Sequence, residues 1–199
     1  WQFHLDWLIM KRSRLSFNYL FDEFVLDPDI ETNKINATAH SFRYSFALLS
    51  SKEHMLNFFI SNINVGTPTF RHGRGTNNFV NNGIPLGWEH GSDGKEVRIG
   101  VNYLYNSQFL LDISTGSIKN GQESITARPY DFYYWTSYQK NKFPSGEISS
   151  KIFLNIIFSY LINSNVWFFF ETEFISFGEN KQEIKTTFNI EINFETKNR

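Results

Sequence analysis

The chain has 199 residues, a formal net charge of −1, no cysteine, and 22 Phe, 9 Tyr and 5 Trp. The near-neutral charge argues against a protein that binds nucleic acid through bulk electrostatics. The absence of cysteine excludes disulfide frameworks, thiolate zinc sites and cysteine nucleophiles. Aromatic residues make up 18% of the chain although its mean hydropathy is polar, at −0.36. The fold must therefore spread its aromatic side chains instead of gathering them in a few apolar runs.

Alternation of apolar and polar residues predicts nine strands and little helix. In the first segment, for example, Phe3, Leu5 and Trp7 alternate with His4 and Asp6. Most of these segments are about 9–11 residues long, which exceeds the roughly 5–6 residues of an ordinary soluble strand. The predicted strands are 2–10, 14–23, 41–50, 54–64, 95–105, 108–118, 148–162, 166–177 and 183–195.

The links between these strands alternate in length. Short links at 11–13, 51–53, 106–107 and 163–165 alternate with long ones at 24–40, 65–94 and 119–147, and only the last link, 178–182, departs from the alternation. Short turns at one rim and long loops at the other are typical of transmembrane barrels. We therefore predict an all-β fold, an antiparallel transmembrane β-barrel of about nine strands. The chain begins at Trp1 without a leader sequence, so we interpret 1–199 as the C-terminal part of one barrel domain that is N-terminally truncated and does not close alone.

The strand pattern has two other interpretations. The stretch 152–170 has the length of a membrane helix, but Asn163, Ser164 and Asn165 form a turn cluster inside it, which favours two strands. A soluble β-sandwich would have shorter strands and no alternation of loop lengths. The barrel accounts for both features and is preferred.

A barrel in lipid also explains the composition. The outer face must be apolar because it meets hydrocarbon, while the inner face is polar. Aromatic residues near strand ends fit the girdles at the membrane interfaces; these are Trp7, Tyr19, Tyr105, Tyr160 and Trp167. The expected location is the bacterial outer membrane, with lipid and lipopolysaccharide as partners.

The long loop 66–94 is rich in Gly and Asn and suits hydrogen bonding to sugars. Arg71, His72 and Arg74 form a basic cluster in it that can meet anionic sugars or lipopolysaccharide phosphates. The loop lacks the strand-to-helix context and G-K-[ST] motif of a phosphate-binding loop. We therefore predict that this loop contacts polysaccharide.

Glu89, His90 and Asp93 in the same loop have the residue types of a metal site. The E-H-x-x-D spacing in a glycine-rich segment is weak support, and loop folding through Asx-turns and ion pairs is the preferred explanation. No metal ligand and no cofactor is assigned.

The second long loop, 119–147, is strongly aromatic. Tyr133 and Trp135 lie in it, with Tyr130 before them and Arg128 and Lys140 on either side. Aromatic faces stack on sugar rings while neighbouring polar groups bind hydroxyls. The alternative is an aromatic girdle or a short further strand at 131–137.

The chain resembles the C-terminal portion of the Wzi-type capsule assembly proteins. The resemblance depends on the loop Gly83-Ile84-Pro85-Leu86-Gly87-Trp88-Glu89-His90-Gly91-Ser92-Asp93, in which Leu-Gly is followed by Gly-x-Asp, and on the strand end Asn102-Tyr103-Leu104-Tyr105. The strand end Asp22-Glu23-Phe24 and the stretch 71–78 add to it. Trp88 and Glu89 depart from the family pattern. The resemblance implies an outer-membrane barrel with a lectin-like role, holding exported capsular polysaccharide at the cell surface.

The predicted function is therefore non-catalytic binding and anchoring of polysaccharide by a monomer that does not bind nucleic acid. The residues predicted to contact polysaccharide are Arg71, His72, Arg74, Trp88, Asp93, Tyr133 and Trp135. A general porin or solute channel is the alternative from the transport class. A glycan hydrolase, which would need a carboxylate pair such as Glu171 and Glu191, is the alternative from the enzyme class.

Overall fold

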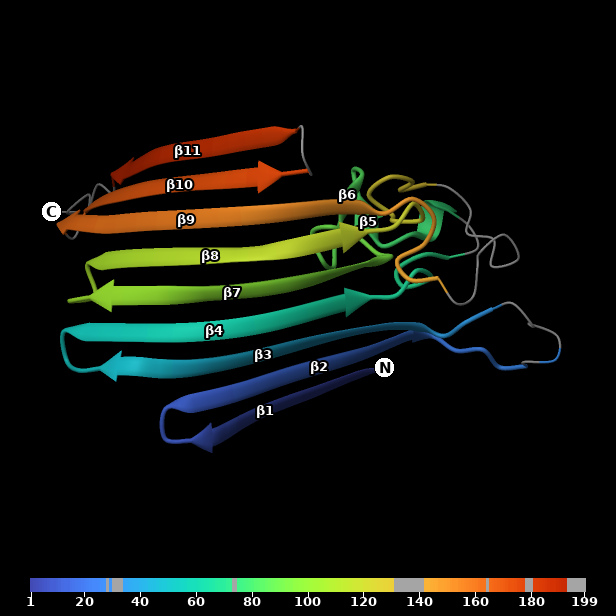
Figure 1. Cartoon of the computed structure of the whole chain (residues 1–199), viewed down its shortest axis with the longest axis horizontal. Helices are drawn as coiled ribbons and strands as arrows, with labels where there is room; N and C mark the ends of the chain where they lie inside the picture. The colour runs from blue at the N-terminus through green and yellow to red at the C-terminus, as the bar shows by residue number, and fades with distance from the viewer. Residues whose placement is uncertain are drawn as a thin grey trace, which may run out of the picture.

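The computed structural model of the chain describes residues 1–27, 29, 34–72, 75–130, 142–163, 165–177 and 181–192. Nine long strands form one antiparallel sheet in which each strand pairs with the next along the chain (Figure 1). The strands are β1 (Gln2–Met10), β2 (Ser13–Glu23), β3 (Ala37–Ser50), β4 (His54–Val65), β7 (Gly94–Tyr105), β8 (Phe109–Asn120), β9 (Ser149–Asn163), β10 (Val166–Ser176) and β11 (Gln182–Ile192). The nine strands predicted from alternation are thus confirmed, except that 193–195, the end of the last predicted strand, lie outside the described residues.

The alternation of link lengths is confirmed as well. The short turns after β1, β3, β7 and β9 lie at one end of the sheet, and the long connections lie at the other (Figure 1). The stretch 152–170 is divided between β9 and β10 and does not form a helix. We call the two ends of the sheet the turn end and the loop end.

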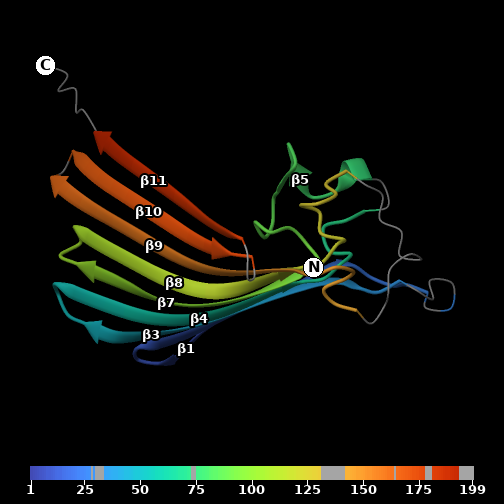
Figure 2. The same cartoon turned by 45° about the horizontal axis from the view of Figure 1, so that its top comes forward.

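The sheet is curved but open (Figure 2). Within the described residues, β1 pairs only with β2 and β11 pairs only with β10, so the nine strands do not close into a barrel. No closed barrel is seen among the described residues, and the fold that is shown is an open, all-β antiparallel sheet.

Strand register gives the sheet one apolar face, because directly paired residues project to the same side. One row across all nine strands illustrates it, and eight of its nine members are apolar or aromatic. The row is Trp7, Leu15, Tyr44, Ile60, Ile99, Thr115, Leu154, Phe174 and Ile184. Many of these side chains are exposed, including Ile60 at 38% and Ile184 at 64%. We call this surface the apolar face.

A chain of aromatic rings runs across the apolar face towards the turn end. It starts at Tyr103 on β7, and neighbouring ring centroids lie 5.1–5.9 Å apart, with planes at 67–83°. Such edge-to-face pairs each add about 0.5–1.5 kcal/mol beyond their area burial. The rings are Tyr103, Phe109, Phe158, Phe168 and Phe188. They link five consecutive strands.

The opposite surface, which we call the polar face, carries charged and small residues. The row next to the apolar row described above contains Asp6, Ser16, Arg43, Ser61, Arg98, Gly116, Phe153, Ile175 and Glu183. Two phenylalanines are buried on this face. Phe59, 3% exposed, lies opposite Gly100, and Arg43 covers it with its guanidinium carbon 3.9 Å from the ring centroid.

The same arrangement recurs three strands away. Phe153 is 2% exposed, lies opposite Gly116 and is covered by Arg98, whose guanidinium carbon is 4.7 Å from the ring centroid. In each case the glycine leaves the space that the ring occupies, and the arginine shields the ring while its charge interacts with the ring face. These two units form much of the small buried core on the polar face.

We predict that Gly116→Ala lowers the free energy of unfolding by about 1–3 kcal/mol. The added Cβ would lie 2.2 Å from the Val97 carbonyl oxygen and 2.9 Å from the Phe153 ring. Denaturant unfolding measures the change. Ser117→Ala, one residue along and on the opposite face, is the matched control and should change it by less than about 0.5 kcal/mol. Equal stabilities of the Gly116→Ala variant and the wild type would contradict this prediction.

Candidate functional site

The loops between β4 and β7 and between β8 and β9 gather at the loop end of the sheet (Figure 2). Their described parts are 66–72, 75–93, 121–130 and 142–148, and we call them the loop cluster. The cluster contains a short 3₁₀ turn, η1 (Gly75–Asn77), and a small hairpin of β5 (Val80–Asn81) and β6 (Ile84–Pro85).

Asp93 is the centre of the loop cluster. Its carboxylate accepts hydrogen bonds from the Thr67 hydroxyl at 2.7 Å, the Glu123 backbone N–H at 3.1 Å and the Ser145 backbone N–H at 2.9 Å. The Ser145 hydroxyl also donates to it. The residue is 0% exposed and has a positive φ of 55°. One carboxylate therefore joins three loop segments that are far apart in the sequence.

Arg71 is likewise buried, at 1% exposure. Its guanidinium lies 3.1 Å from the Glu123 carboxylate and also donates to the Glu123 carbonyl. Arg128 binds the other carboxylate oxygen of Glu123 at 3.3 Å. Arg71 and Asp93 are thus brought together through Glu123, in the interior of the loop cluster.

This placement corrects the role expected for two of the predicted contact residues. A side chain without exposed surface cannot stack on or bind a polysaccharide that lies outside the loops. Arg71 and Asp93 hold the loops in shape, because a buried charge persists only when it is paired and hydrogen-bonded. The sequence pattern identified both residues as candidate contact residues but did not distinguish a structural role in the loops from contact with a ligand.

Trp88 and His72 are partly exposed. The Trp88 indole N–H donates to the Glu96 carboxylate at 3.2 Å, and its ring lies so close to Gly94 that a Cβ there would be 2.8 Å from the indole. The His72 backbone N–H donates to the Asn78 side chain at 2.8 Å. Both side chains remain candidates for ligand contact.

The other predicted contact residues, Arg74, Tyr133 and Trp135, lie outside the described residues, as does the alternative strand at 131–137. Tyr130, at the edge of the described part of that loop, is 56% exposed.

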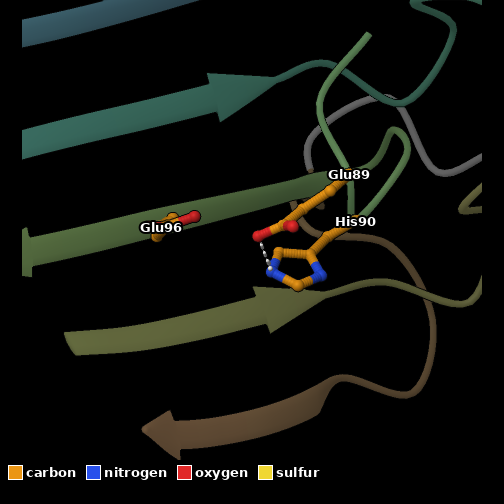
Figure 3. A group of neighbouring side chains, drawn as sticks. All are labelled: Glu89, His90 and Glu96. Carbon is orange, nitrogen blue, oxygen red and sulfur yellow. Dashed lines mark ion pairs between the residues drawn. The ribbon is translucent and has the colours of Figure 1, made fainter. Parts of the chain in front are cut away.

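Glu89, His90 and Glu96 form a cluster that the sequence interpretation only half anticipated (Figure 3). A carboxylate oxygen of Glu89 lies 3.3 Å from His90 Nε2 and 3.9 Å from Arg98. The His90 ring, and with it the charge of Arg98, holds the pKa of the Glu89 carboxyl below its usual range. Asp93 is not part of the cluster. Glu96, which is on β7, takes its place because the chain turns back after Gly91.

Two open grooves adjoin this turn. A groove of about 360 Å³ is lined by Trp88, Phe70 and residues of β1, β2, β3 and β4, among them Asn18 and His40. The other, of about 220 Å³, is lined by His90, Ser124, Thr126 and Lys151 together with Asn120 and Ser149. One short loop segment therefore contributes a side chain to an aromatic groove and to a polar one.

The carboxylate pair considered for hydrolysis is separated by the strand register. Glu171 lies opposite Thr187 and Glu191 lies opposite Trp167, four residues further along the ladder. At a strand rise of about 3.3 Å per residue this is about 13 Å, beyond the roughly 5–9.5 Å of glycosidase pairs. This pair does not have the geometry that the hydrolase alternative requires.

Among the residues that the structure describes, no helix has the length and apolar character needed to cross a lipid bilayer.

Comparison with protein-family models, with curated proteins and with solved structures finds no match. The function is therefore inferred from the residues and geometry of this chain.

We predict that Asp93→Ala lowers the free energy of unfolding by about 3–5 kcal/mol, since each buried donor left unsatisfied costs about 1–3 kcal/mol, and loosens the loop cluster. The substitution leaves the buried Glu123 and Ser145 N–H groups without their acceptor. Limited proteolysis within 121–130 and denaturant unfolding measure the effect. Glu147→Ala, an exposed carboxylate in the same connection, should leave both unchanged. If the two variants behave alike, Asp93 is not the centre of the cluster.

Proposed function

We propose that this chain is part of an outer-membrane β-barrel that binds polysaccharide at its loop end without chemical conversion. The observation that carries the membrane part of the proposal is the row of apolar side chains across all nine strands, backed by a polar row on the other face. Such a division is the pattern of strands that face hydrocarbon on one side and a lumen on the other.

The exposed surface supports this proposal energetically. Exposed apolar area costs about 25 cal/mol per Å² in water, and the apolar face includes exposed side chains on β1, β4, β7, β9, β10 and β11, which are Trp7, Ile60, Ile99, Leu154, Phe174 and Ile184. The strands have 9–15 residues, enough to cross the hydrocarbon layer, for which about 9–11 tilted residues suffice. The proposal requires partners for the edges of β1 and β11, since unpaired backbone groups are costly in lipid.

The grooves beside Trp88 and His90 support the polysaccharide part. Sugar rings stack on aromatic faces, and their hydroxyls bind amide, hydroxyl and charged groups. Trp88 offers the first kind of surface, and Ser124, Thr126 and Lys151 offer the second. Because these groups lie at the end of the sheet that carries the long loops, a bound polysaccharide would lie outside the membrane. The resemblance to capsule assembly proteins is in agreement with this role.

A porin or solute channel is the second candidate. It is favoured by the charged residues on the polar face, where Arg43 and Arg98 occupy one row and Asn102 donates a hydrogen bond to Asp112. Charged inner faces line water-filled channels. Conductance of the protein in planar bilayers distinguishes the two candidates, because a polysaccharide anchor does not need an open lumen.

Single cysteines test the membrane orientation, since the chain has no cysteine of its own. We predict that a spin label at Ile60→Cys is accessible to oxygen dissolved in lipid, whereas one at Ser61→Cys is accessible to a water-soluble relaxant. The two positions are neighbours on β4 and lie on opposite faces. Equal accessibility of both labels to the water-soluble relaxant, in the protein reconstituted in vesicles, would contradict membrane insertion.

Polysaccharide binding is tested at Trp88. We predict that Trp88→Ala weakens binding to purified capsular polysaccharide about tenfold, the loss of one stacking contact of about 1.4 kcal/mol. Trp88→Phe, which keeps an aromatic face, should retain most of the affinity. Trp167→Ala, at the turn end, is the matched control. Undiminished binding by Trp88→Ala, or no binding by the wild type to any of a panel of neutral and acidic polysaccharides, would contradict the proposal.

A further inference from the structure

The cluster of Glu89, His90 and Glu96 has the composition of a metal site. One imidazole nitrogen and two carboxylate oxygens lie within 4.8 Å of one another. Around a zinc ion with bonds of about 2.0–2.2 Å, tetrahedral ligand atoms lie about 3.4 Å apart. The Glu89 side chain is 70% exposed and on a loop, and its oxygen already lies 3.3 Å from His90 Nε2, close to that separation. The other separations, all within 4.8 Å, exceed it by at most about 1.4 Å.

A second observation points to a ligand at the same place. Nε2 of His90 is shielded from solvent and makes no hydrogen bond of good geometry with any residue that the structure describes. Its close polar neighbour is a carboxylate oxygen of Glu89 at 3.3 Å, in a geometry that falls short of a hydrogen bond. A shielded imidazole nitrogen without a well-formed hydrogen bond is costly, and the ring edge that carries it faces the Glu89 carboxylate, to which Figure 3 draws the ion pair. A metal ion there would satisfy it.

Two of the three proposed ligand residues, Glu96 and His90, are held in place by hydrogen bonds from neighbouring side chains. Glu96 is 4% exposed and on β7, where the Trp88 indole N–H and the Arg98 guanidinium each donate to one of its oxygens, at 3.2 Å and 2.6 Å. Each oxygen keeps a second lone pair for a metal. Donors behind a carboxylate ligand orient it and are a regular feature of metal sites.

The backbone carbonyl of His90 accepts hydrogen bonds from the Asn120 side chain at 2.9 Å and the Ser124 hydroxyl at 3.1 Å. The His90 ring lies edge-on to the Trp88 ring, with centroids 5.1 Å apart and planes at 89°. The backbone of His90 is therefore anchored and its ring packed against Trp88 before any ion binds, which lowers the entropic cost of binding.

The charge balance also permits a divalent ion. The two carboxylates supply two negative charges and Arg98, 2.6 Å from Glu96 and 3.9 Å from Glu89, supplies one positive charge, so that one net negative charge remains to meet the ion. Because the chain has no cysteine, a soft thiolate site is impossible. One imidazole with two carboxylates suits Zn²⁺, which accepts both nitrogen and oxygen ligands, better than Ca²⁺, which prefers oxygen alone.

We infer that Glu89, His90 and Glu96 bind a Zn²⁺ ion that fastens the loop carrying Trp88 to the start of β7. Three protein ligands leave a fourth position for water. The site does not depend on the proposed function, because its ligands and geometry are the same whether or not the protein binds polysaccharide. Its effect is structural: Trp88, which lines the larger groove, is held between a ligand at residue 89 and one at residue 96.

Isothermal titration of the metal-free protein with ZnCl₂ tests this inference. We expect one equivalent to bind, with Glu89→Gln and His90→Ala each weakening the affinity at least tenfold. Zn²⁺ should also raise the thermal unfolding temperature of the wild type, and a chelator should reverse the rise. His4→Ala, on β1 and far from the cluster, is the matched control and should bind as the wild type does.

We expect the Glu89→Gln variant to fold as the wild type does, because this exposed side chain contributes little packing. A loss of Zn²⁺ binding in this variant would therefore not be due to misfolding. Binding of one equivalent that is unchanged in Glu89→Gln and His90→Ala would overturn the inference, as would a wild type that shows no saturable binding of Zn²⁺. Both results are independent of polysaccharide binding, because the titration with ZnCl₂ contains no polysaccharide.

Discussion

Strand register is the constraint on which the rest of this structure depends. Each pairing sets residues of like character side by side, so that one row of apolar side chains runs from Trp7 on β1 to Ile184 on β11. A slip of one residue in any pair would turn that strand's apolar side chains to the polar face. Such a slip would also break contacts between the aromatic rings that link five neighbouring strands, which raises its free-energy cost. Register therefore decides at once what the two faces of the sheet contact.

The polar face shows how a surface rich in charge still holds a core. Phe59 and Phe153 each lie over a glycine of the neighbouring strand and beneath an arginine. The glycine provides space, the ring fills it, and the guanidinium covers the ring while keeping its own polar edge available. Arg98 uses that edge to hold Glu96. The packing of the sheet thereby fixes a carboxylate at the loop end, and the loop residues His90 and Trp88 are placed against it.

The sequence was sufficient for the strands and their order, and insufficient for the loop end. Period-two alternation is repeated over nine segments, and the turn cluster around Asn163 divides β9 from β10, so local pattern and global fold agree. In the loops no such repetition exists. Asp93 and Glu89 are both acidic residues in a glycine-rich segment, and only tertiary contacts make the first a buried acceptor for Thr67, Glu123 and Ser145. Those partners lie 26 to 52 residues away, beyond the reach of motif spacing.

The difference between strand pattern and loop contacts also explains why Glu96, and not Asp93, belongs to the cluster with Glu89 and His90. Asp93 precedes β7 with a positive φ, which turns its side chain into the loops. Glu96 lies on the strand, where alternation sends it to the polar face, the side on which Trp88 and His90 rest. A sequence interpretation that had continued the period-two pattern to the first residues of the strand could have placed Glu96 on the face below that loop. The strand pattern thus also determines which carboxylates can meet a loop residue, and it extends physical inference from the sheet into the candidate site.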